Sequence, residues 1–220
     1  MPLVDAMSTQ RAIRRLLPDP VDDEVVLRCI ELATRAPTGG NRQGWEFVVV
    51  RDPEVKHQLA RLNRQAWSVY RRLGASRARR DPSLQRIAEA VQWQADHFEE
   101  VPVVVVACLR GRSPIWAPPV LAASFYGSIF PAVQNLLLAA RAAGLGAALV
   151  TLPVWSVTLA RRTLGLPRTV TPVAVVPLGW PSGRYGPTSR RPVGEVVHLD
   201  RYGNQPFRGT SRTTAPAAAE

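Results

Sequence analysis

Three arginines near the N-terminus have the spacing to bind a doubly charged anion. The segment reads Arg11-Ala12-Ile13-Arg14-Arg15. The surrounding residues predict a helix over 4–16, and residues three and four apart share one face of a helix. Arg11 would then lie beside Arg14 and Arg15, where converging guanidinium groups can bind a phosphate monoester through paired hydrogen bonds. A solvated basic face is the alternative for this segment taken alone.

A second candidate lies between a predicted helix over 22–36 and a predicted strand over 45–51. It reads Pro37-Thr38-Gly39-Gly40-Asn41-Arg42-Gln43-Gly44-Trp45. The adjacent glycines would let a flat ligand approach the backbone, and Thr38, Asn41 and Gln43 offer donors and acceptors to a heteroaromatic edge. An ordinary turn is the alternative, although a turn alone does not need so many amides. The glycine spacing also differs from that of dinucleotide-binding loops.

A third candidate, Ser189-Arg190-Arg191-Pro192, places two cations before a stiff proline, and taken alone it is more typical of a solvated loop. The chain of 220 residues has a formal net charge of +11, and Lys56 is its one lysine. Such a charge raises the question of nucleic-acid binding. The densest cationic patch lacks the interleaved aromatic residues of a nucleic-acid module, so we expect a solvated face and no nucleic-acid partner. That patch consists of Arg71, Arg72, Arg77, Arg79 and Arg80.

The positions of cysteine and histidine argue against several other chemistries. Cys29 and Cys108 lie in apolar runs without metal-like spacing, which predicts that both are small buried hydrophobic residues. His57, His97 and His198 are far apart, so neither a metal site nor a Ser-His-Asp triad is predicted. No apolar run reaches the length of about 18 residues that a membrane span needs. The N-terminus lacks the apolar core of a signal peptide, and a cytoplasmic location is the default expectation.

Hydrophobic periodicity predicts a single α+β domain over residues 1–208, followed by a disordered tail over 209–220. Residues 71–82 and 111–119 are expected to be loops. Further helices are predicted over 54–70, 84–98, 125–143 and 157–164, with that over 125–143 the longest, and further strands over 101–109, 147–152 and 170–178.

Taken in order, these segments resemble the FMN-binding nitroreductase family over residues 6–203. The N-terminal arginine segment resembles the family's Arg-Ser-x-Arg-x-Phe opening, and the loop resembles its Ala-Pro-Ser-x-x-Asn-x-Gln-Pro-Trp element. Residues 132–136 and the Gly144-Leu145-Gly146 turn are similar to its central helix and the turn that follows, and residues 191–198 to its closing element. The resemblance implies a central, mostly antiparallel sheet flanked by helices, with a long central dimerisation helix. It also implies a homodimer with FMN at the interface, each pocket being lined by both chains.

The resemblance further implies which residues hold the cofactor. Thr151 or the Leu152 amide is the candidate partner of flavin N5, because Pro153 has no N–H, and no catalytic acid or base can be named. Trp116 and Phe125 are candidates either for stacking or for the core. The cofactor-binding set falls into a phosphate and ribityl group (Arg11, Arg14, Arg191), residues facing the isoalloxazine ring (Pro37, Thr38, Gly39, Asn41), residues on its other side (Leu149, Thr151, Leu152), and the additional positions Ala12, Gln134 and Arg190.

Three positions depart from the family pattern. Ala12 stands in place of serine, Leu16 in place of phenylalanine, and Gly44 in place of the proline before Trp45. We expect these changes to weaken FMN binding without abolishing it.

The resemblance implies an enzyme that uses NAD(P)H to reduce nitroaromatic, quinone or similar flat acceptors by two electrons. In the expected ping-pong cycle, a reduced nicotinamide gives hydride to flavin N5 and leaves before the small-molecule substrate takes its place. The positive charge favours NADPH over NADH. The alternatives are a deazaflavin-dependent redox enzyme, a non-catalytic protein that stores or senses flavin and, less favoured, a nucleic-acid-binding protein.

Overall fold

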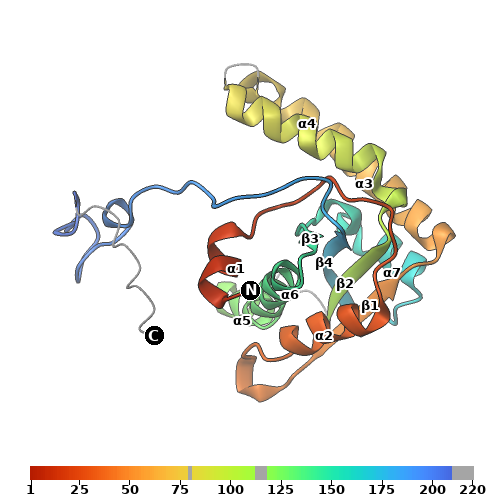
Figure 1. The fold of residues 1–220 in the computed structure, drawn as a ribbon. Helices are drawn as coiled ribbons and strands as arrows, with labels where there is room; N and C mark the ends of the chain where they lie inside the picture. Colours follow the sequence, from red (N-terminus) through yellow and green to blue (C-terminus); the bar gives the residue numbers. More distant parts are fainter. Residues whose placement is uncertain (79–80, 112–117, 210–220) are drawn as a thin grey trace. The chain divides into compact units, whose positions relative to one another are not determined.

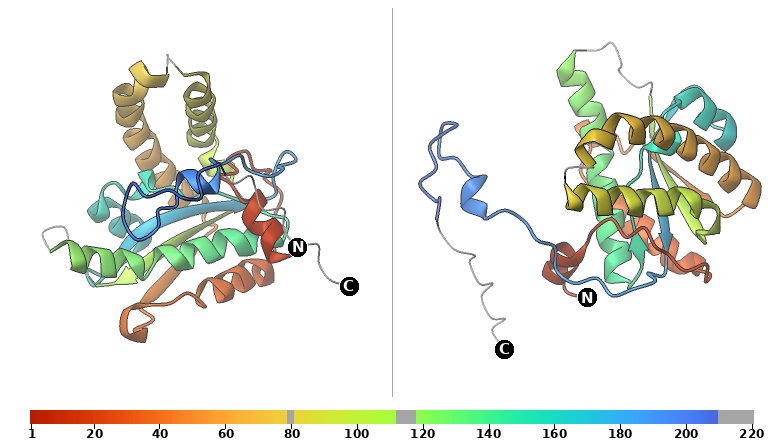
Figure 2. Two further views of the ribbon diagram at one scale, coloured as in Figure 1. Left: turned by 90° about the vertical axis from the view of Figure 1, so that its left-hand side faces the viewer. Right: turned by 90° about the horizontal axis from the view of Figure 1, so that it is seen from above.

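The first compact unit of the chain is a four-stranded sheet with helices on both faces (Figure 1, Figure 2). A computed structural model describes residues 1–78, 81–111 and 118–209. The chain divides into two units, Met1–Gly186 and Pro187–Glu220, and each is described by itself. Residues 210–220 of the predicted tail lie outside the described residues, so the division expected after residue 208 stays a prediction. The elements are α1 (Leu3–Thr9), α2 (Asp23–Ala33), η1 (Gly39–Asn41), β1 (Trp45–Val50), α3 (Pro53–Ala78), α4 (Pro82–Asp96), η2 (Phe98–Glu100), β2 (Val103–Arg110), α5 (Pro119–Gly127), α6 (Phe130–Ala142), β3 (Gly146–Ala147), η3 (Leu152–Val154), α7 (Val157–Leu164), β4 (Val170–Gly179) and η4 (Val193–Glu195).

The centre of the first unit is the antiparallel pairing of β2 with β4. The sheet has the order β1-β2-β4-β3, and each of its pairs is antiparallel. Every residue of β4 is buried, as is every residue of β2 except Arg110. A bulge lies between Ala107 and Cys108, where Cys108 faces Pro172, a residue that has no N–H for the ladder. The predicted α+β fold with a central, mostly antiparallel sheet is confirmed.

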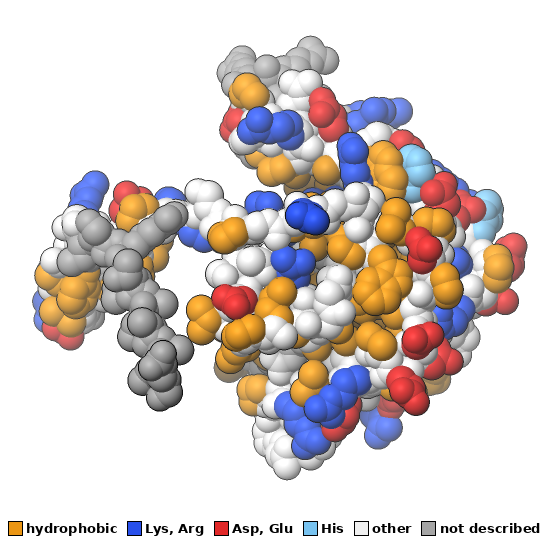
Figure 3. Space-filling model, viewed as in Figure 1, with side chains coloured by type: hydrophobic (Ala, Val, Ile, Leu, Met, Phe, Trp, Pro, Cys, Tyr) orange, Lys and Arg blue, Asp and Glu red, His pale blue; other side chains and the backbone are white. Residues whose placement is uncertain are grey.

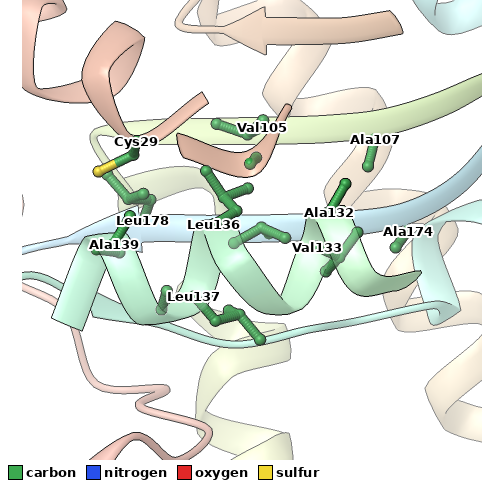
Figure 4. Packing of buried hydrophobic residues seen from close by; sticks show 14 of the residues in the cluster. Cys29, Val105, Ala107, Ala132, Val133, Leu136, Leu137, Ala139, Ala174 and Leu178 are labelled. Carbon is green, nitrogen blue, oxygen red and sulfur yellow. The ribbon is translucent and has the colours of Figure 1, made fainter. Parts of the chain in front are cut away.

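Alternate residues of β2 point to opposite faces of the sheet and build two cores. Val105 and Ala107 pack with α2 and α6 on one face, as Figure 4 shows. Val104 and Val106 pack on the other face with Leu59 of α3. Both faces of the central strands are therefore covered.

The predicted helix over 4–16 is wrong beyond Thr9, where α1 ends. Gln10 already has extended backbone angles. The Ile13 N–H bonds to the carbonyl of Ala147 at 3.0 Å, and Leu16 forms an isolated antiparallel bridge with Pro181. These long-range backbone bonds outweigh the local helical preference, so the arginine segment runs extended beside the sheet.

The predicted loop over 71–82 is also wrong for most of its length. α3 continues to Ala78 and, with 26 residues, is longer than the segment predicted to be the longest helix. Arginine, leucine and alanine favour a helix, so the basic composition of this stretch did not indicate a loop; Arg71, Arg72 and Leu73 are exposed on α3. α3 packs against α4, where Trp67 Nε1 donates to Gln92 Oε1 at 2.8 Å.

The predicted helix over 125–143 is divided into α5 and α6 at Ser128 and Ile129. Pro131 lies in the first turn of α6 and cannot donate to the preceding turn. The helical stretch over 119–142 remains the long central segment of the fold. The predicted strand over 147–152 is shorter than expected, because β3 ends at Ala147 and Val150 forms only a single bridge with Val175.

Residues 119–142 are also long and apolar enough to pass a length-and-hydropathy test for a membrane span. Core packing explains the apolar character of α6, since Ala132, Val133 and Leu136 are fully buried against the sheet. In α5, by contrast, Val120 and Leu121 are 69% and 55% exposed. The apolar surface of α5 therefore needs an explanation outside the core of one chain.

Both cysteines should be unreactive while the protein is folded. Cys29 and Cys108 are buried as predicted. Burial raises the pKa of each thiol, and that of Cys108 reaches about 12, with Glu46 adding to the effect. The thiolate is the reactive form, so a thiol reagent at pH 8 should label neither cysteine in native buffer and both in guanidinium chloride. Rapid labelling of the native protein would contradict this packing.

Candidate functional site

The extended arginine segment is held tightly against the end of the sheet. Ile13 and Leu16 are 1% and 7% exposed, and both side chains press against Gly146 of β3. A Cβ atom at Gly146 would lie 2.7 Å from Ile13 Cγ2 and from Leu16 Cδ2. The Gly-Leu-Gly turn therefore includes a glycine because the arginine segment approaches its backbone too closely for a side chain.

The three arginines of this segment have different surroundings. The Arg15 guanidinium lies 5.7 Å from the centroid of the Trp93 ring, within the range of a cation–π contact. Arg14 is half-buried, and burial lowers its pKa. Among the residues that the structure describes, Arg14 has no acceptor, and Arg11 is exposed without an ion-pair partner. A desolvated guanidinium is stabilised by an opposite charge, so Arg14 is the cation best placed to receive an anion.

Side chains of the loop between α2 and β1 form hydrogen bonds within the loop itself. The Gln43 N–H donates to Thr38 Oγ1 at 3.1 Å, and Gln43 Nε2 donates to Asn41 Oδ1 at 3.1 Å. Asn41 and Gln43 both have positive φ, at 51° and 48°, which non-glycine residues rarely adopt. The loop is thus preorganised at some conformational cost, a feature common where backbone meets ligand.

Ser128, at the break between α5 and α6, anchors this loop. The Gly39 N–H donates to Ser128 Oγ at 3.2 Å, and Trp45 Nε1 donates to the Ser128 carbonyl at 2.8 Å. A pocket of about 480 Å³ lies beside the loop and is also lined by Phe125 of α5. Phe125 therefore faces this pocket, and its ring also makes an edge contact with Tyr126. Trp116, the other candidate stacking residue, lies outside the described residues.

The predicted flavin-facing stretch after β3 follows the edge of β4. Leu149 and Thr151 are exposed, and Val150 between them exchanges two backbone hydrogen bonds of 2.8 Å with Val175. Within the described part of the chain, neither the Thr151 hydroxyl nor the Leu152 N–H has a hydrogen-bond partner. Thr151 and Leu152 line a second pocket of about 480 Å³, together with Tyr126, Phe130, Trp155 and residues at the start of β4.

Gln134 is exposed on α6, one turn after Phe130 and two turns before Arg141. This face of α6 therefore leads from the pocket beside Thr151 to the arginine end of the sheet. Arg141 was not predicted as a site residue, although a cation in the last turn of a helix is a recognisable feature. Its Nε donates to Thr9 Oγ1 at 2.9 Å, and its Nη2 donates to the Tyr185 carbonyl at 2.7 Å.

The predicted site residues fall at two ends of the first unit. The loop over 37–44 lies where β1 begins, since the Arg110 N–H donates to the Gly44 carbonyl at 2.8 Å. The arginine segment lies at the other end of β2 and β4 (Figure 1). β2 has eight residues, so these ends are about 24 Å apart. One copy of the chain does not bring the two groups together.

Arg190 and Arg191 belong to the second unit, where both are exposed. Arg190 Nη1 donates to the Ser189 carbonyl at 2.8 Å. That unit is held by a bond from Gln205 Nε2 to the Glu195 carbonyl at 2.9 Å, and by the close approach of Gly194 to the Phe207 backbone.

No metal centre is recognisable among the described residues, where no group of three or more His, Cys, Asp or Glu could hold an ion. His57 and His97 have local partners instead. His57 lies 3.0 Å from Glu99 Oε2, and the His97 ring stacks on Trp93 with 4.1 Å between the centroids.

Comparison with known proteins identifies the family. The family model described as "Nitroreductase family" matches residues 7–180, so the chain belongs to that family and is an oxidoreductase of it. The chain is 29% identical to an NADH dehydrogenase of Thermus thermophilus over 90% of its own length and 97% of the relative's. It is 26% identical to a protein of Methanothermobacter thermautotrophicus described as an NADH dehydrogenase/NAD(P)H nitroreductase, over 84% and 81%. A Desulfovibrio desulfuricans protein described as a nitroreductase, solved in complex with FMN, matches with a TM-score of 0.64 and 25% identity, covering 92% of this chain and 98% of that one.

Replacing Gly146 with alanine should destabilise the fold and displace the arginine segment. The added methyl group would overlap Ile13 and Leu16, and overpacking of this kind costs about 1–3 kcal/mol. The free energy of unfolding, measured by urea titration, should fall by that amount. Gly186→Ala is the matched control, because its Cβ would meet no atom within 4 Å. Equal stability of the two variants would contradict the close contact.

Proposed function

We propose that the chain is an FMN-dependent oxidoreductase that transfers two electrons from NAD(P)H to flat acceptors such as quinones and nitroaromatics. The observation that carries the proposal is a desolvated cation without a counter-charge, Arg14, on a segment bonded to the strand end that leads to Thr151 and Leu152. Arg14 suits the phosphate of FMN, and the donors at Thr151 and Leu152 suit the edge of its ring.

The phosphate end fits the cations. Arg14 and the exposed Arg11 would hold the phosphate, and guanidinium groups bind phosphate through two parallel hydrogen bonds. Arg141 supports them indirectly, because it ties α6 to α1 and to the segment after β4. Gln134, on the exposed face of α6, would reach the ribityl chain.

The ring end fits the unsatisfied donors. The Thr151 hydroxyl and the Leu152 N–H would donate towards flavin N5, and Leu149 would lie against the ring. When bound, FMN would supply the hydride chemistry. The chain's contribution would be to orient the ring and to place hydrogen-bond donors at its edge. NAD(P)H and acceptor would use the same exposed face in turn.

We infer that the working form is a homodimer in which each flavin contacts both chains. The loop with Pro37, Thr38, Gly39 and Asn41 lies about 24 Å from the arginine segment. The short ribityl chain of FMN does not bridge that separation, so the loop that faces the ring would come from the partner chain. The exposed apolar residues of α5 support this inference, because a second copy would cover them.

Arg190 and Arg191 are further candidates for contacts to the FMN phosphate, as the family resemblance implies. Both guanidinium groups are exposed within their unit, and Arg191 has no carboxylate partner among the described residues. Ala12 would contribute only backbone contacts, since it has no hydroxyl group.

Absorbance spectroscopy tests the proposed function directly. The purified protein, or the protein mixed with FMN, should show a bound-flavin spectrum that bleaches when NADPH is added without oxygen. A flavin spectrum that NADPH does not bleach would favour a deazaflavin donor or flavin storage. Failure to bind FMN at all would contradict the proposal.

Mixed dimers test the shared site. Arg14→Gln should weaken the phosphate half, and Thr38→Asp should place a negative charge at the ring half while keeping an acceptor for the Gln43 N–H. Each variant alone should have little quinone reductase activity. A one-to-one mixture of unfolded and refolded variants should regain about a quarter of wild-type activity, because half of the dimers have one intact site of two. No recovery, with mixed dimers shown by two affinity tags, would place both residues in the same chain's site.

A further inference from the structure

A second cationic pocket lies between the end of α7 and the start of β4, apart from the predicted flavin residues. Its volume is about 640 Å³, within the range of small-ligand sites. The side chains that line it include three arginines and two threonines, and neither a carboxylate nor an aromatic ring. The lining residues are Thr158, Arg161, Arg162, Gly165, Leu166, Arg168 and Thr169.

One of the three arginines is fixed in place by the protein. Arg161 Nε donates to the Val170 carbonyl at 2.7 Å, and its Nη2 donates to Thr171 Oγ1 at 2.9 Å. Thr171 is itself buried and donates to the Gly111 carbonyl at 2.7 Å. The guanidinium group is therefore preorganised at the wall of the pocket, and both of its acceptors are uncharged.

The other two arginines have no compensating charge. The six ion pairs found among the described residues use carboxylates elsewhere, and none includes Arg162 or Arg168. Thr158 lies four residues before Arg162 and shares its helix face, so a hydroxyl group accompanies the cation. The concentration of positive charge in a concave site attracts anions.

The carboxyl end of α7 would oppose an anion if its carbonyl groups were free, because that end of a helix carries partial negative charge. Here the last turn is capped. Gly165 has a φ of 64°, and the Leu166 N–H donates to the Arg161 carbonyl at 2.9 Å, while the Gly165 N–H approaches the Arg162 carbonyl at 3.4 Å. The cap satisfies the carbonyl groups of Arg161 and Arg162, which reduces the opposition that this helix end presents to an anion.

We propose that this pocket binds the phosphoryl group of a small phosphorylated ligand. Planar guanidinium groups with nearby hydroxyl groups match the oxygen atoms of phosphate. The concave shape and the absence of an aromatic lining favour a small ligand over single-stranded nucleic acid, which proteins bind by stacking bases on aromatic side chains. This assignment is independent of the proposed flavin chemistry.

Calorimetric titration with inorganic pyrophosphate at low ionic strength, using the full chain with FMN added, tests the proposal. Removing both exposed cations in Arg162→Gln/Arg168→Gln should weaken binding about tenfold or more, since each charge-assisted hydrogen bond contributes substantially. The control Arg61→Gln/Arg72→Gln removes the same charge from exposed positions on α3 and should change binding by less than about twofold.

Any one of four outcomes would overturn the proposal. The first is that the wild-type protein does not bind pyrophosphate. The second is that both double variants lose affinity equally, which would assign binding to the net charge. Alternatively, Arg14→Gln would abolish binding while Arg162→Gln/Arg168→Gln retained it, which would assign it to the N-terminal arginines. Binding of a single-stranded oligonucleotide through Arg162 and Arg168, tighter than that of pyrophosphate, would replace the small ligand with nucleic acid.

Discussion

The pairing of β2 with β4 is the constraint on which the rest of the first unit depends. Both strands are buried along nearly their whole length, so a shift of one residue would exchange the side chains of the two cores. The register therefore fixes which elements lie at each end of the sheet. The loop after α2 is bonded at the Arg110 end, and the arginine segment at the Gly179 end.

Under the proposed function, this separation would give each chain two incomplete binding surfaces. One combines a preorganised loop with the serine at the break between α5 and α6. The other would combine the half-buried Arg14, at the Gly179 end, with the unpaired donors at Thr151 and Leu152, which follow β3 along β4 towards the start of that strand. Because the sheet holds the two surfaces apart, the proposed homodimer would complete each site by bringing together surfaces from two copies. The exposed apolar side chains of α5 then have a natural partner.

The arginines that carry the charge of the chain have different surroundings, and three of these are informative. Some are paired with carboxylates at the surface, such as Arg51 with Asp23 at 2.7 Å and Arg64 with Glu99 at 2.8 Å. Arg15 lies over Trp93. A third group, with Arg14, Arg162 and Arg168, has no compensating partner in the described part of the chain. On the face seen in Figure 3, cations and carboxylates are interspersed. Net charge is therefore a poor guide to ligand sites, and the uncompensated arginines in concave or desolvated positions are the informative ones.

Local chemistry in the sequence was sufficient for several elements. The helix predicted over 157–164 has those bounds in the structure, because Ser156 caps its first turn and Gly165 adopts the left-handed conformation after its last. The β-branched runs of β2 and β4 were recognisable because both faces of these strands are buried. The family could also be recognised, since its motifs are short and depend on residue type and order.

Only the tertiary structure decided where those motifs lie. Ile13 and Leu16 are three residues apart, a spacing that suits a helix. In the structure, however, the Ile13 N–H bonds to the carbonyl of Ala147, and Leu16 forms a bridge with Pro181, both far along the chain. The hydrogen bond from the Gly39 N–H to Ser128 Oγ could not be predicted from neighbouring residues, because 89 positions separate the two in the sequence. Backbone hydrogen bonds and close packing between distant segments are set by the whole fold, whereas residue types and spacing report only on a segment's neighbours.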